Sequence, residues 1–137
     1  MFLLDTNVVS EPRKRRPHGA VLAWIQSTVD TDLYLSAVTL GEIQTGIELT
    51  RELDATKAAE IEAWSDMVAS SYGVLPLDGP TFRVWGRLKH RRSDTLYEDA
   101  MVAATAMVHS LTVVTRNVTD FSSSGVKLLN PFDTTQV

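Results

Sequence analysis

The chain has no cysteine among its 137 residues, which excludes disulfide bonds and every metal site that needs thiolate ligands. No apolar run approaches the roughly 20 residues that a helix needs to cross a bilayer. The first residues turn acidic at Asp5, which is too early for a secretory signal peptide. We therefore expect a cytoplasmic protein with no membrane partner.

The length and composition are typical of one globular domain. Apolar residues make up 44% of the chain and charged residues 22%, which is enough apolar material to bury a core. No repeat or long linker interrupts the sequence. We expect one domain over residues 1–132, followed by a short C-terminal tail at residues 133–137.

The charge is acidic overall but unevenly distributed. A net charge of −4 argues against a protein that coats nucleic acid through bulk positive charge. Two local basic patches remain: residues 13–16, and a group formed by Arg83, Arg87, Lys89, Arg91 and Arg92. Each patch is either a solvated surface or a contact for a phosphate backbone.

Short apolar runs alternate with segments of helical periodicity. The runs at residues 2–4, 33–35, 74–77, 111–115 and 126–129 predict strands, and helices are expected near residues 17–28, 38–51, 54–72 and 97–109. A further helix is expected to open at residues 78–80 and to carry Phe82, Trp85 and Leu88. Thr39 is the expected N-cap of the second of these helices, and Pro76 indicates an edge strand or a strand end. The alternation favours a three-layer α/β/α domain with a mainly parallel sheet.

Polar side chains gather where the predicted strands end. Asp5 directly follows the first strand, and Glu42 lies one turn into the helix after the second. Thr115, Asn117 and Asp120 stand at and beyond the end of the strand at residues 111–115. Because ligands bind beyond the carboxyl ends of the strands in open parallel sheets, these residues are candidates for one site.

Asp99 adds an acid from a helix. Residues three, four and seven positions further on share its helix face, and all of them (Val102, Ala103 and Ala106) are apolar. A carboxylate at the head of a core-facing stripe is costly unless a cation or a donor meets it. Glu42 has a weaker version of this pattern, with Val38, Gly46 and Leu49 on its face.

Gathered carboxylates repel one another unless they are protonated or bound to a cation. Arg116 is one local partner that the sequence offers. Oxygen ligands alone suit Mg²⁺ or Mn²⁺ better than zinc, and such an ion can activate water for attack on a phosphodiester. Helix capping remains an alternative role for Asp5, Asp78 and Asp120, and Glu42 can point to water. Trp24, Trp64 and Trp85 stand at helical spacing among aliphatic residues and are interpreted as core.

Four segments form a recognisable pattern: residues 3–7 (LLDTN), 40–43 (LGEI), 98–106 (EDAMVAATA) and 114–121 (VTRNVTDF). In this order and spacing they resemble the PIN-domain toxins of bacterial toxin–antitoxin pairs, of the VapC and FitB type, over residues 2–132. The resemblance implies a PIN-like fold and a Mg²⁺- or Mn²⁺-dependent ribonuclease. It also implies a homodimer and a cognate antitoxin. The antitoxin would cover the active-site groove with its C-terminal segment and would supply the DNA-binding domain.

The same resemblance assigns roles residue by residue. Asp5, Asp99 and Asp120 match metal-binding acids and Glu42 matches the second acid of the family, while Thr115 and Asn117 match polar positions of the closing motif. Many relatives carry an aspartate where this chain has Asn117, so whether Asn117 or Asp120 completes the metal site stays open. The mechanistic hypothesis is that Asp5, Asp99 and Asp120 hold the metal, directly or through water, with Glu42 as a further candidate metal ligand. Glu42 would orient or deprotonate the attacking water.

Three other interpretations fit the sequence less well. A signalling receiver domain needs an acidic pair near its first strand, where Asp5 stands alone. An aspartate-nucleophile phosphatase needs a second aspartate two residues later, where this chain has Asn7. The alternative from another class is a catalytically weak PIN-like module that only binds RNA or a protein partner.

Overall fold

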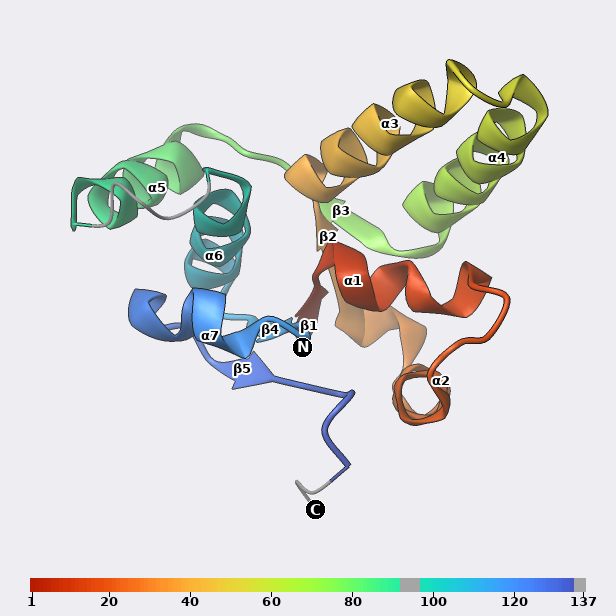
Figure 1. Ribbon diagram of the computed structural model, residues 1–137. Helices are drawn as coiled ribbons and strands as arrows, with labels where there is room; N and C mark the ends of the chain where they lie inside the picture. Colours follow the sequence, from red (N-terminus) through yellow and green to blue (C-terminus); the bar gives the residue numbers. More distant parts are fainter. Residues whose placement is uncertain (92–96, 135–137) are drawn as a thin grey trace.

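The computed structural model describes residues 1–91 and 97–134 (Figure 1). Its centre is a five-stranded sheet in which every strand pairs in parallel, in the order β3-β2-β1-β4-β5. The strands are β1 (Phe2–Leu4), β2 (Leu33–Ser36), β3 (Gly73–Leu75), β4 (Thr112–Val114) and β5 (Leu128–Leu129). β1 therefore lies in the middle, with β2 on one side and β4 on the other.

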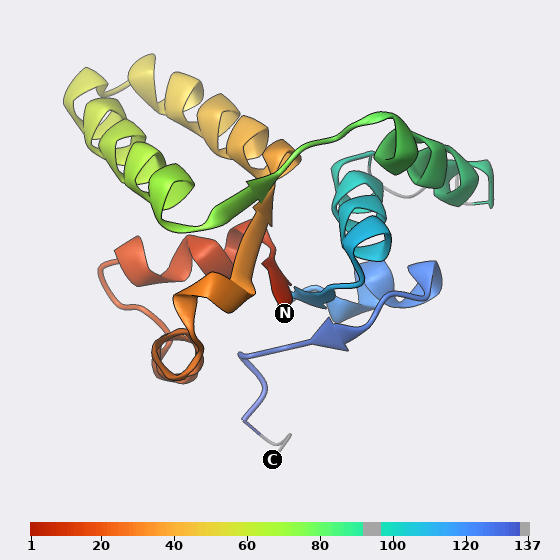
Figure 2. The same cartoon turned by 180° about the vertical axis from the view of Figure 1, so that it is seen from behind.

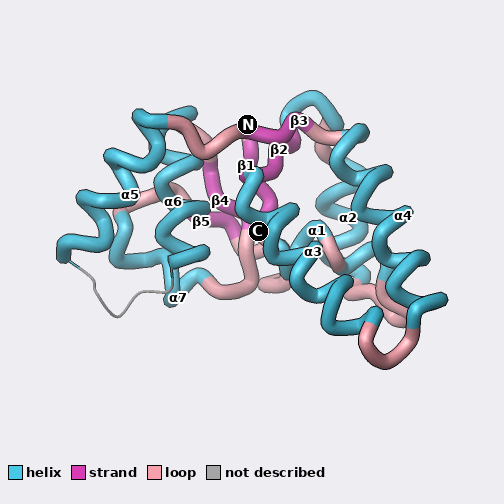
Figure 3. Tube along the Cα trace, turned by 90° about the horizontal axis from the view of Figure 1, so that it is seen from above, coloured by secondary structure: helices cyan, strands magenta, loops and turns pink. Residues whose placement is uncertain are grey.

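Helices fill the intervals between the strands. They are α1 (Thr6–Val9), α2 (Gly19–Ser27), α3 (Ala37–Arg51), α4 (Ala55–Ser71), α5 (Gly79–Arg91), α6 (Tyr97–His109) and α7 (Val118–Phe121), with 3-10 turns η1 (Glu11–Arg13), η2 (Asp30–Asp32) and η3 (Ser122–Ser124). Seen from above, the strands lie between α1–α4 on one side and α5–α7 on the other (Figure 3). This arrangement confirms the three-layer α/β/α prediction.

Alternation along the strands builds a separate core on each face of the sheet. Leu4, Leu35 and Val114 pack against the layer of α1 to α4. Their neighbours Leu3 and Val113 point the other way and pack against α6 and α7. Because successive strand residues point to opposite faces, near-continuous apolar runs are what a sheet covered on both sides requires.

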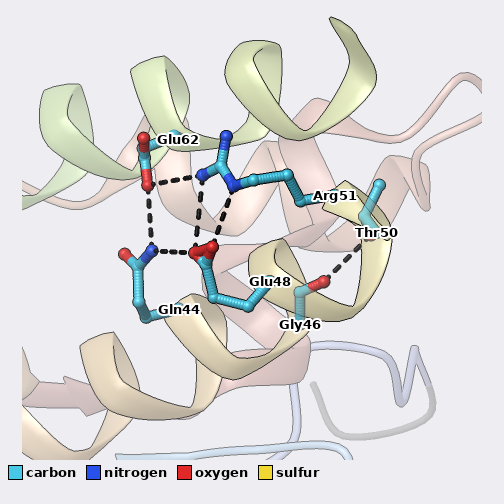
Figure 4. Close-up of polar contacts among 6 residues, drawn as sticks. All are labelled: Gln44, Gly46, Glu48, Thr50, Arg51 and Glu62. Atoms are coloured by element: carbon cyan, nitrogen blue, oxygen red, sulfur yellow. Dashed lines mark hydrogen bonds and ion pairs between the residues drawn. The ribbon is translucent and has the colours of Figure 1, made fainter. Parts of the chain in front are cut away.

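Two helical hairpins flank the sheet. α3 and α4 form one, and a polar network joins them along their exposed sides (Figure 4): Arg51 pairs with Glu48 at 2.8 Å and with Glu62 at 3.1 Å, and Gln44 donates to Glu62. From behind, β3 lies beside β2 and the following segment carries the chain to α5 (Figure 2). α5 and α6 form the second hairpin in the opposite layer.

Caps fix where the helices begin. Asp54 accepts from the backbone N–H of Lys57 and starts α4, as the sequence predicts. The predicted cap Thr39 is wrong. Ser36 accepts from the Val38 N–H and caps α3, while Thr39 is a fully buried residue inside the helix. Ser36 is the last residue of β2, so strand and helix join without a loop, and periodicity alone gave no sign of such a junction.

Other boundaries shift by a few residues, which is usual at helix and strand ends. The short helix α7 was not predicted, because four residues are too few to show a helical period. In the described part of the chain, no helix is long and apolar enough to cross a membrane. The proposed boundary at residue 132 stays a prediction, and residues 135–137 lie outside the described part.

Candidate functional site

Asp5 is the most enclosed acid of the candidate site. It follows the central strand, its backbone N–H donates to Val114 O at 2.9 Å, and its side chain is 6% exposed. Oδ1 accepts from the Thr6 N–H at 2.9 Å, which caps α1, and Oδ2 accepts from the Thr115 hydroxyl at 2.8 Å. Burial raises the pKa of Asp5, and the Thr115 hydrogen bond opposes that rise. Asp5 therefore caps α1 and remains a candidate site residue.

Asn7 and Thr115 hold Asp5 in place. Asn7 Nδ2 donates to Asp5 Oδ2 at 3.3 Å and to Thr115 Oγ1 at 3.4 Å. Its Oδ1 accepts from the Arg116 backbone N–H at 3.0 Å, and Thr115 Oγ1 accepts from the Asn117 backbone N–H at 3.0 Å. The two strand ends are thus joined through side chains, and the orientation of the Asp5 carboxylate is fixed before any ligand arrives.

Glu42 approaches the same place from α3. The Thr6 hydroxyl donates to Glu42 Oε1 at 3.4 Å, which links α3 to the turn after β1. Burial, followed by the negative charges of Asp5 and Glu98, raises the pKa of Glu42 to about 7. The apolar stripe expected below Glu42 is wrong at one position, because Leu49 is 61% exposed; the buried face of α3 contains Thr39, Ile43 and Ile47.

Asp99 lies in the first turn of α6, above the stripe that the sequence indicated. Val102, Ala103 and Ala106 are each at most 1% exposed and pack against the sheet. Burial, followed by the charges of Asp5 and Asp120, raises the pKa of Asp99 to about 6. Asp5 and Asp120 lie on other segments of the chain, so the fold gathers acids that are far apart in the sequence.

Asp120 and Asn117 come from the segment after β4. Asp120 is exposed within α7 and lines a small hollow together with Asp99, Ala103 and Ser123. Asn117 caps the same helix by position but makes no side-chain capping bond. Asp120 thus shares a surface with Asp99, whereas Asn117 is tied to Thr115 through its backbone N–H.

These acids have no matching base in the described part of the chain. The Arg116 guanidinium lies 4.3 Å from the Phe132 ring centroid and forms no ion pair with the site. The ion pairs of the described residues lie elsewhere, at Lys14–Glu11 and around Arg51. The sequence offered Arg116 as a local partner of the acids, and among the described residues this partnership is not realised as an ion pair.

The donor set suits a hard cation that keeps part of its water shell. Within residues 1–91 and 97–134, no three His, Asp or Glu side chains are already arranged as a closed ligand cage. Mg²⁺ does not require one, because it usually binds through one or two carboxylates and retains several waters. Oxygen donors whose pKa values are raised by burial and by the charges of neighbouring acids are stabilised by such a charge.

Comparison with known proteins agrees with this geometry. Residues 2–123 match the model of the PIN domain. The chain belongs to the PIN-domain family. Toxin FitB of Neisseria gonorrhoeae is 34% identical, with 96% of this chain and 99% of that protein covered. The VapC ribonuclease Y4jK of Sinorhizobium fredii is 33% identical, over 97% and 99% of the two chains.

A solved structure gives the same answer for the fold of this PIN domain. The crystal structure of FitAcB from Neisseria gonorrhoeae aligns with a TM-score of 0.88 and 33% identity, covering 96% of this chain and 99% of that one. The parallel sheet and its flanking helices are therefore those of the FitB and VapC structures.

The site of this PIN domain contains residues that the sequence analysis did not single out. Asn7 bridges the two central strand ends, Thr6 contacts Glu42, and Glu98 raises the pKa of both Glu42 and Asp99. Asn7 stands two residues after Asp5 and Glu98 stands directly before Asp99, so nearness to a candidate acid was the available signal. Nothing in the sequence indicated the contact between Thr6 and Glu42, because it joins residues 36 positions apart.

Proposed function

We propose that this protein is a metal-dependent endoribonuclease, the toxin of a toxin–antitoxin pair, which hydrolyses RNA phosphodiester bonds at the carboxylate cluster. The observation that carries the proposal is the cluster itself. Asp5, Glu42 and Asp99 come from three parts of the chain, and all three have raised pKa values. The charge of Asp5 contributes to the shifts of the other two, and no base among the described residues pairs with them. Relatives that match nearly the whole chain are named a toxin and a ribonuclease.

Asp5, Asp99 and Asp120 are the proposed ligands of Mg²⁺, directly or through water, and Mn²⁺ suits the same oxygens. When bound, the ion would supply charge stabilisation at the phosphate and a more acidic water. Asp5 is pre-positioned by Thr115 and Asn7, whereas Asp99 and Asp120 face a common hollow. These contacts favour Asp120 over Asn117 as the acid that completes the set.

Glu42 is the proposed proton acceptor. A carboxyl with a pKa near 7 can both accept and release a proton at neutral pH, which suits a general base. Its hydrogen bond from Thr6 orients Oε1 toward the turn that carries Asp5. Thr115 acts on the Asp5 carboxylate, and the Asn117 amide can donate to a water or a phosphate oxygen at the rim.

The proposed partners follow from the same relatives. Solved structures of relatives are complexes named FitAB and VapBC, and some of them are bound to DNA. We propose that this chain likewise acts in the cytoplasm, forms a homodimer and binds an antitoxin that provides the DNA contact. The exposed basic residues 13–16, together with Arg83 and Arg87, would guide the RNA backbone. Arg92 and the side chain of Arg91 lie outside the described residues.

The proposal is tested with purified protein, freed of any partner and incubated with total RNA and fluorescent single-stranded RNA in Mg²⁺, Mn²⁺ or EDTA. Asp5→Ala and Asp99→Asn run alongside after circular dichroism confirms that both fold. Glu48→Gln is the matched control, because it removes an acid from α3 outside the site. Cutting that requires metal, survives in the control and disappears in both site variants is the expected result.

A catalytically weak binding module is the remaining candidate. Such a module would bind RNA or a protein partner without cutting. The observation that favours it is that no three histidine, aspartate or glutamate side chains among the described residues form a ready metal cage. No cutting of any RNA by well-folded wild type, together with no heat of metal binding, would establish that reading and overturn the ribonuclease.

A further inference from the structure

The surface of α5 carries two different rows of side chains. Phe82, Trp85 and Lys89 follow one another at helical spacing and form the aromatic row, which Tyr97 of α6 extends. Arg83, Arg87 and His90 follow one another at the same spacing on the neighbouring face and form the arginine row. The two rows run side by side along the helix.

The aromatic row has a partly buried centre and two exposed ends: Trp85, which the sequence analysis interpreted as core, is half-buried with its indole Nε1 shielded from solvent. Phe82 meets Trp85 edge-on at 6.0 Å between ring centroids, and Trp85 meets Tyr97 at 5.8 Å. The two outer rings remain accessible, since Phe82 is 44% exposed and Tyr97 is 59% exposed. Lys89 Nζ lies 4.4 Å from the Tyr97 centroid, so a cation accompanies the rings. Tyr97 directly precedes Glu98 and Asp99, so this end of the row and Asp99 both belong to the first turn of α6.

The arginine row leads to the same place. Arg83, Arg87 and His90 line an open hollow between α5 and α6 whose wall includes Leu88. Leu88 also lines the small hollow that contains Asp99 and Asp120. Because Leu88 lines both, the arginine row and the two acids lie on the walls of neighbouring hollows.

Gly86 separates the two rows. It stands four residues after Phe82 and three after Arg83, so it lies between them on the helix surface. A Cβ built at this position would meet no atom within 4 Å. A glycine inside a helix costs about 1 kcal/mol in stability relative to alanine. Here the missing side chain leaves a shallow depression between the aromatic row and the arginine row, which we call the saddle.

We propose that α5 is the element that holds the single-stranded RNA flanking the cut site, with bases against the aromatic row and phosphates against the arginine row. This inference rests on the proposed ribonuclease function and names how its substrate is held. Aromatic rings stack on any base, and basic side chains track the backbone, which is the combination that binds single strands without sequence readout. In a chain of net charge −4, this local positive charge is complementary to a polyanion.

The test measures equilibrium binding in EDTA, where the metal-dependent cut cannot occur. The probes are a fluorescent single-stranded RNA, a base-free ribose-phosphate oligomer of equal length and charge, and a duplex RNA. The variants are Phe82→Ala/Tyr97→Ala and Arg83→Ala/Arg87→Ala, with Tyr97→Phe as the conservative control. Met67→Ala removes an equally exposed apolar side chain from α4 and serves as the matched control.

The base-free oligomer separates the two rows. We expect the aromatic double variant to bind RNA about tenfold more weakly and to bind the base-free oligomer as wild type does. The arginine double variant should weaken binding to both probes and flatten the logarithmic salt dependence by about 0.7 for each phosphate that it no longer neutralises. Tyr97→Phe and Met67→Ala should bind as wild type does.

Gly86 gives a second test that does not depend on removing a ring. Gly86→Leu fills the saddle and should weaken RNA binding, whereas Gly86→Ala should raise the thermal midpoint and leave binding nearly unchanged, since its methyl group meets open space. Both variants keep the helix, so a loss of binding in Gly86→Leu alone would not be a folding defect.

Several results would overturn the proposal. Equal losses for RNA and base-free oligomer in the aromatic variant would contradict base stacking, and so would tighter binding of duplex than single strand by wild type. A changed mass by light scattering with unchanged RNA binding would assign this face to contacts between copies of the chain. If wild type cuts RNA while the aromatic variant binds normally, only this inference falls. If wild type neither cuts nor binds RNA, the proposed function falls with it.

Discussion

Two acidic groups on the same helix behave in opposite ways. Glu48 of α3 lies beside Arg51, whose side chain donates to both of its oxygens, and this contact lowers the pKa of Glu48 (Figure 4). Glu42 lies less than two turns earlier, where burial and the charges of Asp5 and Glu98 raise its pKa to about 7. Identical residue types on one helix thus have opposite electrostatic surroundings.

The difference separates acids that are neutralised by a cationic side chain from acids that have no such partner among the described residues. The α3–α4 network is complete, because Arg51 supplies the positive charge for Glu48 and Glu62. The cluster around Asp5 is incomplete, because it has hydrogen-bond donors but no cation in the described residues. Raised pKa values at converging acids are a mark of functional sites rather than of stability.

The largest effect is expected for Asp99→Asn. The substitution keeps the size of the side chain and removes its charge from the hollow that it shares with Asp120. Because removing even an outer-shell partner of a metal costs about 10–100-fold, we expect cleavage to fall by more than about a hundredfold. Initial cleavage rates in Mg²⁺ measure this, and activity within tenfold of wild type would remove Asp99 from the proposed ligand set.

Thr115→Val is expected to lower both stability and cleavage by removing a hydrogen bond that positions Asp5. The valine fits the fully buried position but cannot donate to Asp5 or accept from the Asn117 N–H. Loss of the Thr115 hydrogen bond leaves Asp5 Oδ2 with only the longer bond from Asn7, which costs about 1 kcal/mol or more in the free energy of unfolding, and Asp5 becomes still harder to ionise. Urea unfolding and cleavage assays test both parts, with Thr115→Ser as the control that restores the hydroxyl. Full activity in Thr115→Val would show that the hydrogen bond does not position Asp5.

A smaller effect of opposite sign is expected for Glu42→Gln in the metal-free protein. The folded pKa of Glu42, about 7, lies above its usual value of 4.5, so its contribution to stability is present at low pH and is lost as the pH rises from about 4.5 through 7. The variant avoids this loss. After allowance for solvent screening, we expect it to be about 1 kcal/mol more stable than wild type at pH 8.

Thermal unfolding in EDTA measures this difference. The advantage of Glu42→Gln should shrink as the pH falls to about 4.5, and Asp99→Asn should follow the same trend over a slightly lower pH range, because the pKa of Asp99 is about 6. Added Mg²⁺ should reduce the advantage of both variants. A variant that is less stable than wild type at pH 8 would contradict the claim that repulsion destabilises the cluster.

The smallest effect is expected in the neutralised network. Arg51→Met and Glu48→Gln break exposed ion pairs, which contribute little to stability. We expect thermal midpoints within about 2 °C of wild type and unchanged RNA cleavage. A loss of cleavage in either variant would contradict the claim that the α3–α4 network is purely structural and would assign it a role in RNA cleavage.

Much of the fold could be predicted from the sequence because apolar runs and helical stripes are local patterns. The strand at residues 2–4 and the stripe below Asp99 were recognised in this way, and both are confirmed. The Ser36 cap and the short helix α7 were not, because a strand that runs directly into a helix and a single helical turn leave no periodic signal.

The candidate site could be predicted in outline and not in its contacts. A parallel topology brings Asp5 and Thr115 to one edge, and the structure adds that they share a hydrogen bond across 110 positions. Arg116, which the sequence offered as a local partner, lies over the Phe132 ring, a contact that depends on how the C-terminal segment packs. Long-range side-chain contacts of this kind are invisible in a single sequence.

The most direct test of the central claim is a calorimetric titration of Mn²⁺ into metal-free wild type, Asp99→Asn and Glu48→Gln at a pH of about 6, where the raised pKa values leave part of the cluster protonated. The uncompensated cluster should bind the ion in wild type and in Glu48→Gln and release protons on binding, because carboxyls with raised pKa values must ionise to coordinate it. Asp99→Asn should lose this binding. Equal binding by wild type and Asp99→Asn, or its loss in Glu48→Gln, would contradict the assignment of the metal site to this cluster.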